Sequence, residues 1–162
     1  MDFLLDSNIF IEAKNRYYGF DICPGFWDWM DSVCGNTVGS IINVRDELIA
    51  GRDELAAWAT DRQDAAWFLR VDDASTQSNF VQVANFIAGQ QYTQPAVAHF
   101  LSKADPWLIA KAMTLGATLI THELPEPGAK KRVPIPNVCT QFGVRCVNTF
   151  DALRHFSAAF RL

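Results

Sequence analysis

The sequence has no long apolar run, because its uninterrupted apolar stretches, such as Phe3 to Leu5, span only a few residues. A membrane-spanning helix needs about 20 consecutive apolar residues, so we expect no membrane span. The amino terminus also lacks a basic stretch that leads into a long apolar segment, which is the pattern of a secretory signal. We therefore expect a cytoplasmic protein.

Cysteine is scarce, and none of the four residues forms a C-x-x-C pair (Cys23, Cys34, Cys139 and Cys146). Closely spaced pairs of that kind are typical of zinc sites and redox motifs. In a chain without an export signal, reduced and mostly buried thiols are a better interpretation than disulfides or zinc ligands.

A broad basic surface is also missing, since 14 Lys and Arg residues face 18 Asp and Glu residues and the net charge is −4. This balance argues against a protein that coats nucleic acid. The charge is uneven, however: residues 1–31 hold six acids and two bases, and residues 124–162 hold six bases and two acids. A basic carboxyl-terminal third can meet phosphates while an acidic centre holds cations, so a nuclease is not excluded.

What the chain does have is enough apolar sequence for a core. Its 162 residues are 49% hydrophobic and 20% charged, which is unlike a disordered chain and typical of one folded domain over residues 1–162. Apolar, β-prone segments predict strands at residues 3–5, 37–39, 67–71, 117–121 and 144–147. Helical spacing and caps predict helices at 8–18, 24–34, 41–50, 53–63, 75–89, in two pieces within 95–116, at 136–141 and at 149–160.

Alternating strands and helices predict an α/β fold, a three-layer α/β/α sandwich around a central, mostly parallel sheet. Ligands bind such a sheet beyond the carboxyl ends of its strands. Asp6 ends the first predicted strand and Glu123 ends the fourth; Asp105 begins the helix before that strand, and Glu47 lies on a helix alongside. Four converging carboxylates repel one another unless a cation neutralises them, and hard oxygen ligands suit Mg²⁺ or Mn²⁺.

Each acid also has an ordinary structural explanation. Asp6 and Asp105 can cap helices, Glu47 can be a solvated helix residue, and Glu123 can lie on a loop surface. Taken singly, these explanations are the better ones. The joint pattern favours a site, because the acids end apolar segments where the fold places its binding edge.

The order of these motifs resembles the PIN domain, a family of metal-dependent ribonucleases that includes VapC-type toxins. Three segments carry the resemblance: Phe3 to Ile11 with its leading aspartate, Val44 to Leu48 with its helix-borne glutamate, and Asp105 to Glu123 with the last two acids. In sequence order and spacing the resemblance covers residues 1 to about 150.

The resemblance implies a PIN-like domain that hydrolyses RNA phosphodiester bonds as the toxin half of a toxin–antitoxin pair. It implies that Asp6, Glu47, Asp105 and Glu123 are the catalytic residues and hold Mg²⁺ or Mn²⁺. The partners it implies are an RNA substrate, an antitoxin protein and a second copy of the chain; an aromatic content of 12% also favours a homodimer.

Two features depart from the family pattern. Glu123 stands where many members have Asp, so its reach is longer and a ligand role can run through water. The loop over residues 124–136 extends beyond a minimal VapC toxin. Nuclease chemistry therefore carries over more securely than toxin biology.

Supporting residues follow from the same placement. Ser7 and Thr121 can hydrogen-bond to the acids or to water, or serve their own backbone as a cap or turn. Lys130, Lys131 and Arg132 can contact an RNA backbone or simply be a solvated loop. His122 is not included, because alternation along a strand sends it and Glu123 to opposite sides.

Two other functions stay open. One is a PIN-like binding module that has lost catalysis, and metal-dependent RNA cleavage would separate it from a ribonuclease. The other is an aspartate-based phosphatase or phosphotransfer domain, which wants a second Asp two residues after Asp6, where this chain has Asn8. Dinucleotide binding is disfavoured because no G-x-G-x-x-G follows the first strand.

Overall fold

Five short parallel strands form the centre of the protein. The structure is a computed structural model that describes residues 1–158. The strands are β1 (Phe3–Leu5), β2 (Val38–Ile41), β3 (Phe68–Leu69), β4 (Thr118–Ile120) and β5 (Cys146–Val147). Their order across the sheet is β3-β2-β1-β4-β5, with every pairing parallel.

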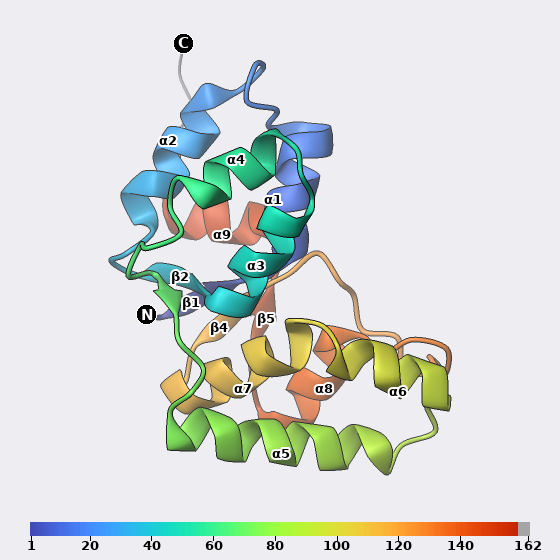
Figure 1. Ribbon diagram of the computed structural model, residues 1–162. Coiled ribbons are helices and arrows are strands. Elements are labelled where there is room, and N and C mark those ends of the chain that lie inside the picture. The colour runs from blue at the N-terminus through green and yellow to red at the C-terminus, as the bar shows by residue number, and fades with distance from the viewer. Residues whose placement is uncertain (159–162) are drawn as a thin grey trace.

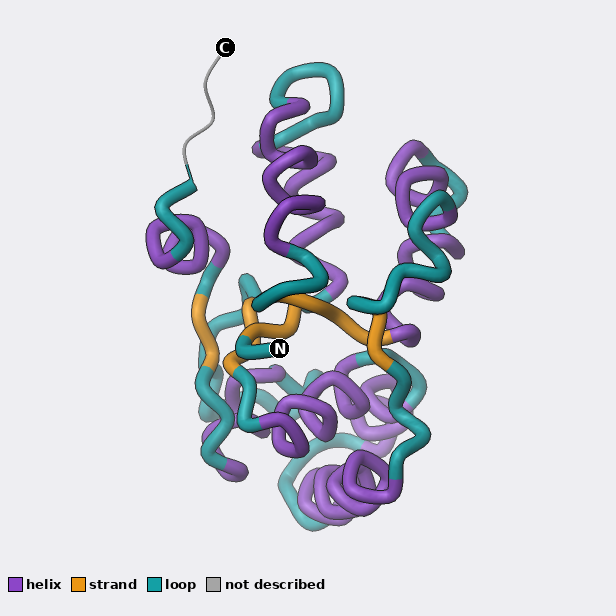
Figure 2. Tube along the Cα trace, turned by 90° about the vertical axis from the view of Figure 1, so that its left-hand side faces the viewer, coloured by secondary structure: helices purple, strands orange, loops and turns teal. Residues whose placement is uncertain are grey.

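Helices cover both faces of this sheet, as Figures 1 and 2 show. One layer contains α1 (Ser7–Glu12), η1 (Ala13–Tyr17), α2 (Pro24–Val33), α3 (Ile42–Ala50), α4 (Glu54–Thr60) and α9 (Thr149–His155). The other contains α5 (Ala74–Ala88), α6 (Gln94–Leu101), α7 (Asp105–Leu115) and α8 (Ile135–Phe142). The predicted three-layer α/β/α fold is confirmed.

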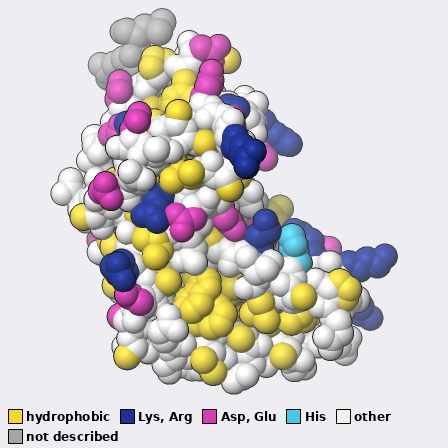
Figure 3. Space-filling view, viewed as in Figure 1, with side chains coloured by type: hydrophobic (Ala, Val, Ile, Leu, Met, Phe, Trp, Pro, Cys, Tyr) yellow, Lys and Arg dark blue, Asp and Glu magenta, His cyan; other side chains and the backbone are white. Residues whose placement is uncertain are grey.

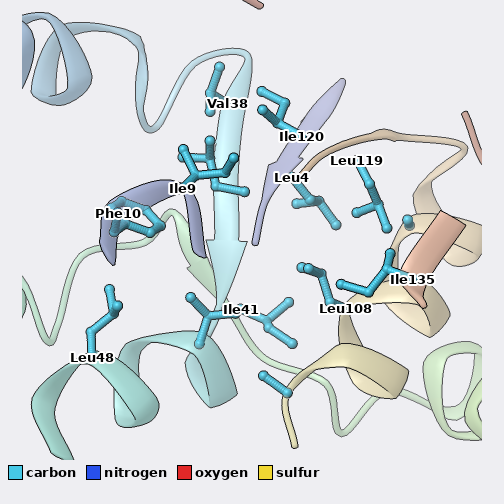
Figure 4. Packing of buried hydrophobic residues seen from close by; sticks show 14 of the residues in the cluster. Leu4, Ile9, Phe10, Val38, Ile41, Leu48, Leu108, Leu119, Ile120 and Ile135 are labelled. Atoms are coloured by element: carbon cyan, nitrogen blue, oxygen red, sulfur yellow. The ribbon is translucent and has the colours of Figure 1, made fainter. Parts of the chain in front are cut away.

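The core lies on both faces of the sheet. Figure 4 shows Phe10 and Leu48 on one side of the strands and Leu108 and Ile135 on the other, all of them almost fully buried. Strands covered on both faces read as continuous apolar runs, which is why the short β1 and β4 segments lack alternation. The buried tryptophans Trp27, Trp58 and Trp67 also belong to this core.

The strand order places a topological switch point at the middle of the sheet. From β1 the chain moves outward to β2 and β3, then returns to the other side of β1 as β4 and continues to β5. The carboxyl ends of β1 and β4 therefore diverge into helices on opposite faces, and the edge between them is where ligands bind in folds of this kind.

Several local predictions differ from the structure. The strand predicted at 37–39 runs over Val38–Ile41 and includes Ser40, whose hydroxyl donates to the Leu5 carbonyl at 2.7 Å, and the helix predicted from residue 41 begins at Ile42. The last helix ends at His155, and the Phe160 end predicted for it lies outside the described residues. Gly143 does end α8, in the left-handed conformation expected of a helix C-terminus.

Within residues 1–158, no helix has the length and apolar character needed to cross a bilayer. All four cysteines are free thiols; Cys34 and Cys139 are buried and the other two are half-buried.

Candidate active site

The first acid, Asp6, lies directly after β1 at the N-cap position of α1, and only 1% of its surface is exposed. Its main support is the Thr121 hydroxyl, which donates to Oδ2 at 2.9 Å. Ser7 and Asn8 donate to the same carboxylate over longer distances of 3.4 and 3.5 Å. A buried carboxylate needs such donors, because burial disfavours its charged form.

Thr121 connects two of the acids. Besides donating to Asp6, its hydroxyl oxygen accepts the backbone N–H of Glu123 at 3.2 Å. The hydroxyl therefore fixes the carboxyl end of β4 against that of β1, which supports the role predicted for Thr121. The Ser7 hydroxyl also donates to Asp6, but over a longer distance that makes the hydrogen bond weaker.

Glu47 reaches the site from α3. Its Oε1 accepts the backbone N–H of Ala104, the N-cap residue of α7, at 3.0 Å. Asp105 was expected as a possible cap, but it is the first residue of α7 and its side chain makes no capping bond. Glu47 fills the capping role from another helix, and Asp105 is left facing the cleft.

Glu123 follows β4, and its Oε2 accepts the backbone N–H of Ile135, the first residue of α8, at 2.7 Å. The four acids thus lie at the amino-terminal ends of α1, α7 and α8. The partial positive charge of a helix amino terminus stabilises nearby carboxylates and offsets part of their repulsion.

The remaining repulsion is evident in two of the acids. Burial, with Glu123 nearby, raises the pKa of Asp6 to about 6. Burial also raises the pKa of Asp105 to about 8, with further contributions from Asp6, Glu123 and Glu47. Asp105 is therefore within electrostatic reach of the other three predicted acids.

Three clefts meet at Glu123. The first holds His99, Asp105, Lys131 and Arg132, and the second holds Asn8, Glu47, His99, Lys103 and Asp105. The third runs along Arg16, Tyr17, His122 and Leu124. In Figure 3, acidic side chains at mid-height of the molecule lie beside Lys and Arg side chains and a histidine.

The three consecutive basic residues Lys130, Lys131 and Arg132 do not all line the same cleft. Lys131 and Arg132 line the first cleft together with the acids. Lys130 lines a separate hollow with Gln90 and Tyr92. His99 and Lys103, which face the carboxylates, were not identified from the sequence, although the position of Lys103 two residues before Asp105 was a usable signal.

His122 also lies closer to the site than strand alternation predicted. β4 ends at Ile120, so the alternation does not extend to residues 122 and 123, and both line the third cleft. Burial lowers the pKa of His122, and its Nε2 lies 3.0 Å from the Thr149 hydroxyl. Burial thus disfavours the charged ring, and the contact with Thr149 holds it in place.

The donor set fits a hard divalent cation in its chemistry. It consists of carboxylate oxygens, and Asp105 accepts no hydrogen bond from any described residue. Among residues 1–158, however, no three His, Cys, Asp or Glu side chains are grouped closely enough to hold one metal ion.

Comparison with known proteins places the chain in a family and a fold. Residues 3–160 match the family described as a domain of unknown function, DUF4411. No curated protein matches the sequence.

Two solved structures are similar over most of their length. One is VapBC2 from Rickettsia felis bound to a DNA fragment from their promoter, with a TM-score of 0.55, 14% identity, and coverage of 91% of this chain and 98% of that one. The other is FitAcB from Neisseria gonorrhoeae, with a TM-score of 0.53, 16% identity and the same coverage of 91% and 98%. The chain therefore belongs to the DUF4411 family and has a PIN-like fold.

Proposed function

We propose that this protein is an endoribonuclease that hydrolyses RNA phosphodiester bonds with Mg²⁺ or Mn²⁺. The observation that carries the proposal is the electrostatic influence of Asp6, Glu47 and Glu123, from three separate parts of the chain, on the buried Asp105. The four acids are not grouped closely enough in this structure to hold one metal ion, so the proposal includes their approach to a cation when it binds. Structural carboxylates pair with cations or cap helices, and here Asp105 does neither. A charge cluster that costs stability in the free protein is typical of a functional site.

The chain's own residues would divide the work. A divalent cation would supply Lewis-acid stabilisation of the phosphate and a water of lowered pKa. Asp6 and Asp105 would hold it most directly, because Glu47 and Glu123 each already accept one backbone N–H. Thr121 would orient Asp6, while Lys103 and Lys131 would face the RNA backbone.

Two alternatives make different predictions. A binding module without catalysis would bind RNA or a partner protein but release no product with any metal. A phosphatase acting through Asp6 would need a second carboxylate two residues on, and here Asn8 donates its amide toward Asp6 instead. That contact argues against phosphotransfer on Asp6.

The deciding experiment is cleavage of labelled RNA with Mg²⁺, with Mn²⁺ and with EDTA. We expect cleavage with either metal and none with EDTA. Asp6→Asn should abolish most activity, whereas Asp46→Asn should keep it, because Asp46 is an exposed residue of α3 that pairs with Arg45 at 2.7 Å. Equal cleavage by wild type and Asp6→Asn would falsify the assignment of the site.

We also propose that the chain is the toxin of a toxin–antitoxin pair. The support is the similarity of its fold to chains of VapBC2 and FitAcB. Growth arrest on expression, relieved by co-expression of a small protein from the adjacent gene, is the expected result. The homodimer stays a prediction, and light scattering that finds only monomer at micromolar concentration would contradict it.

A further inference from the structure

A π-helical turn separates two adjacent tyrosines near the site. Across η1 the Tyr18 N–H donates to the carbonyl of Ala13, five residues earlier, at 2.6 Å. The Tyr18 ring stacks on Phe26 with centroids 4.4 Å apart, inside the helical layer. The Tyr17 ring, with its centroid 6.3 Å from that of Tyr18, is 49% exposed. Single π turns of this kind are often found at functional sites.

Tyr17 is part of an exposed aromatic and apolar group. Its ring centroid lies 6.0 Å from Phe150 and 6.5 Å from His122. Phe150 is 42% exposed and Leu124, beside His122 in the chain, is 74% exposed. Tyr17 and Leu124 line one cleft, and Phe150 contacts Tyr17 beside it. Single exposed apolar residues are ordinary, but a group of them at the edge of a cleft indicates a surface that a ligand covers.

This cleft is continuous with the carboxylates and has cationic edges. Glu123 lines it as well as the two clefts that contain Asp105. Arg16 and Arg132 lie along it, each in contact with one acid: Arg16 with Glu12 at 2.9 Å and Arg132 with Glu126 at 2.6 Å. A chain whose phosphate lies over the carboxylates can therefore extend into this cleft with its backbone beside an arginine.

We propose that the Tyr17 cleft is a subsite for one unpaired nucleobase of the RNA, next to the phosphate that is cleaved. The proposal rests on the nuclease function proposed above and adds a residue that selects the substrate. A half-exposed ring in an ordered aromatic group offers a stacking face, and arginine at the cleft edge suits the phosphate on the same nucleotide. An apolar peptide would use the same rings but would gain nothing from two arginines beside a carboxylate cluster.

The test measures binding apart from cleavage. Fluorescence anisotropy with a short labelled single-stranded RNA is recorded for wild type in EDTA and for the Asp6→Asn protein in Mg²⁺. In both settings we expect Tyr17→Ala to weaken the affinity about tenfold, as loss of one stacked base predicts, and Tyr17→Phe to retain it. Val81→Ala is the matched control, because Val81 is 55% exposed on α5, away from all three clefts.

A second arm locates the base. An abasic nucleotide is moved through the RNA one position at a time; one position should reproduce the tenfold loss in wild type and cause no further loss in Tyr17→Ala. The subsite is wrong if Tyr17→Ala binds RNA like Val81→Ala, if no abasic position matters, or if wild type binds no RNA. The subsite would also be wrong if Tyr17→Ala weakened binding to a protein partner and left RNA binding unchanged. RNA binding that depends on Tyr17 without any cleavage would keep the subsite and reject the nuclease.

Discussion

The pKa of an acid after β3 and the pKa values of two acids at the site are shifted in opposite directions. After β3, Asp73 accepts the Thr76 N–H at 2.9 Å and the Lys111 ammonium at 2.7 Å. The Lys111 ammonium first, and then the helix-capping bonds, hold the pKa of Asp73 well below its usual range. After β1 and at the start of α7, burial and neighbouring acids raise the pKa values of Asp6 and Asp105.

The difference lies in the partners. Asp73 has a cation and two donors that belong to the chain, so its charge stabilises α5 and needs nothing else. The site acids have helix amino termini and a few hydrogen bonds, but no cationic side chain among residues 1–158 forms an ion pair with them. Carboxylates that lack an internal partner are the ones that an external cation would satisfy, and four predictions test that distinction.

The largest expected effect is stabilisation by metal. A cation at one hundred times its dissociation constant adds about 2.7 kcal/mol to the free energy of unfolding. This corresponds to a rise of about 5 to 10 °C in the melting temperature of a domain of this size. Thermal melts with EDTA and with Mg²⁺ should show this rise for wild type and for Asp73→Asn, and little of it for Asp105→Asn. A full rise in Asp105→Asn would remove Asp105 from the metal site.

The second prediction concerns pH in EDTA. Because the folded-state pKa of Asp105 is about 8 and the unfolded value is near 3.8, the folded protein binds more protons between these values. Stability should therefore fall as pH rises from about 4 to 8, by about 2 kcal/mol once screening by water reduces the full effect. Urea unfolding across this range measures it.

The matched comparison is again Asp73. Its lowered pKa gives a contribution of the opposite sign, present above pH 3.8 and lost as the pH falls below that value. Asp105→Asn should flatten the profile above pH 4, and Asp73→Asn should leave that part unchanged. A wild-type profile that rises between pH 5 and 8 would show that the site acids do not repel one another.

The sequence was sufficient for the part of the site that local rules determine. Asp6 and Glu123 follow apolar strands, and parallel strands bring their carboxyl ends to one edge, so both could be placed without coordinates. Asp105 before Pro106 marks a helix start, which was correct to within one residue. These predictions depend only on neighbours in sequence.

Contacts between distant segments were beyond the sequence. The bond from Glu47 to Ala104 joins residues 57 positions apart, and no local pattern shows that Glu47 rather than Asp105 caps α7. The separation of Lys130 from Lys131 depends on how the 124–136 loop packs against α6. Tyr17 became a candidate only in the structure, where it is the last residue of the π turn and lines a cleft together with Glu123.

The third prediction is that replacing Asp by Ala changes the free energy of unfolding in opposite directions in the two regions. In EDTA, Asp105→Ala should raise the free energy of unfolding by about 1 kcal/mol, because folding no longer forces this acid either to take up a proton or to bear a repelled charge, and because alanine is a strong helix former in α7. Asp73→Ala should lower it by about 1 kcal/mol, because α5 loses its N-cap. Urea unfolding of the two variants under identical conditions is the measurement. Destabilisation by both would mean that Asp105 is a structural residue like Asp73.

The smallest expected effect is a difference between two adjacent lysines in the salt dependence of RNA binding. Lys131 lines the cleft with Asp105 and Glu123, whereas Lys130 lines another hollow, and its backbone carbonyl accepts the Thr93 N–H at 2.8 Å. If Lys131 neutralises one phosphate of single-stranded RNA, Lys131→Ala should reduce the slope of log affinity against log salt by about 0.7. Lys130→Ala should leave that slope unchanged, since the hollow that Lys130 lines contains none of the four acids. Anisotropy titrations over a range of NaCl concentrations measure both slopes. Equal slopes for the two variants would show that the loop is a solvated surface, and the external partner of the carboxylates would then be the cation alone.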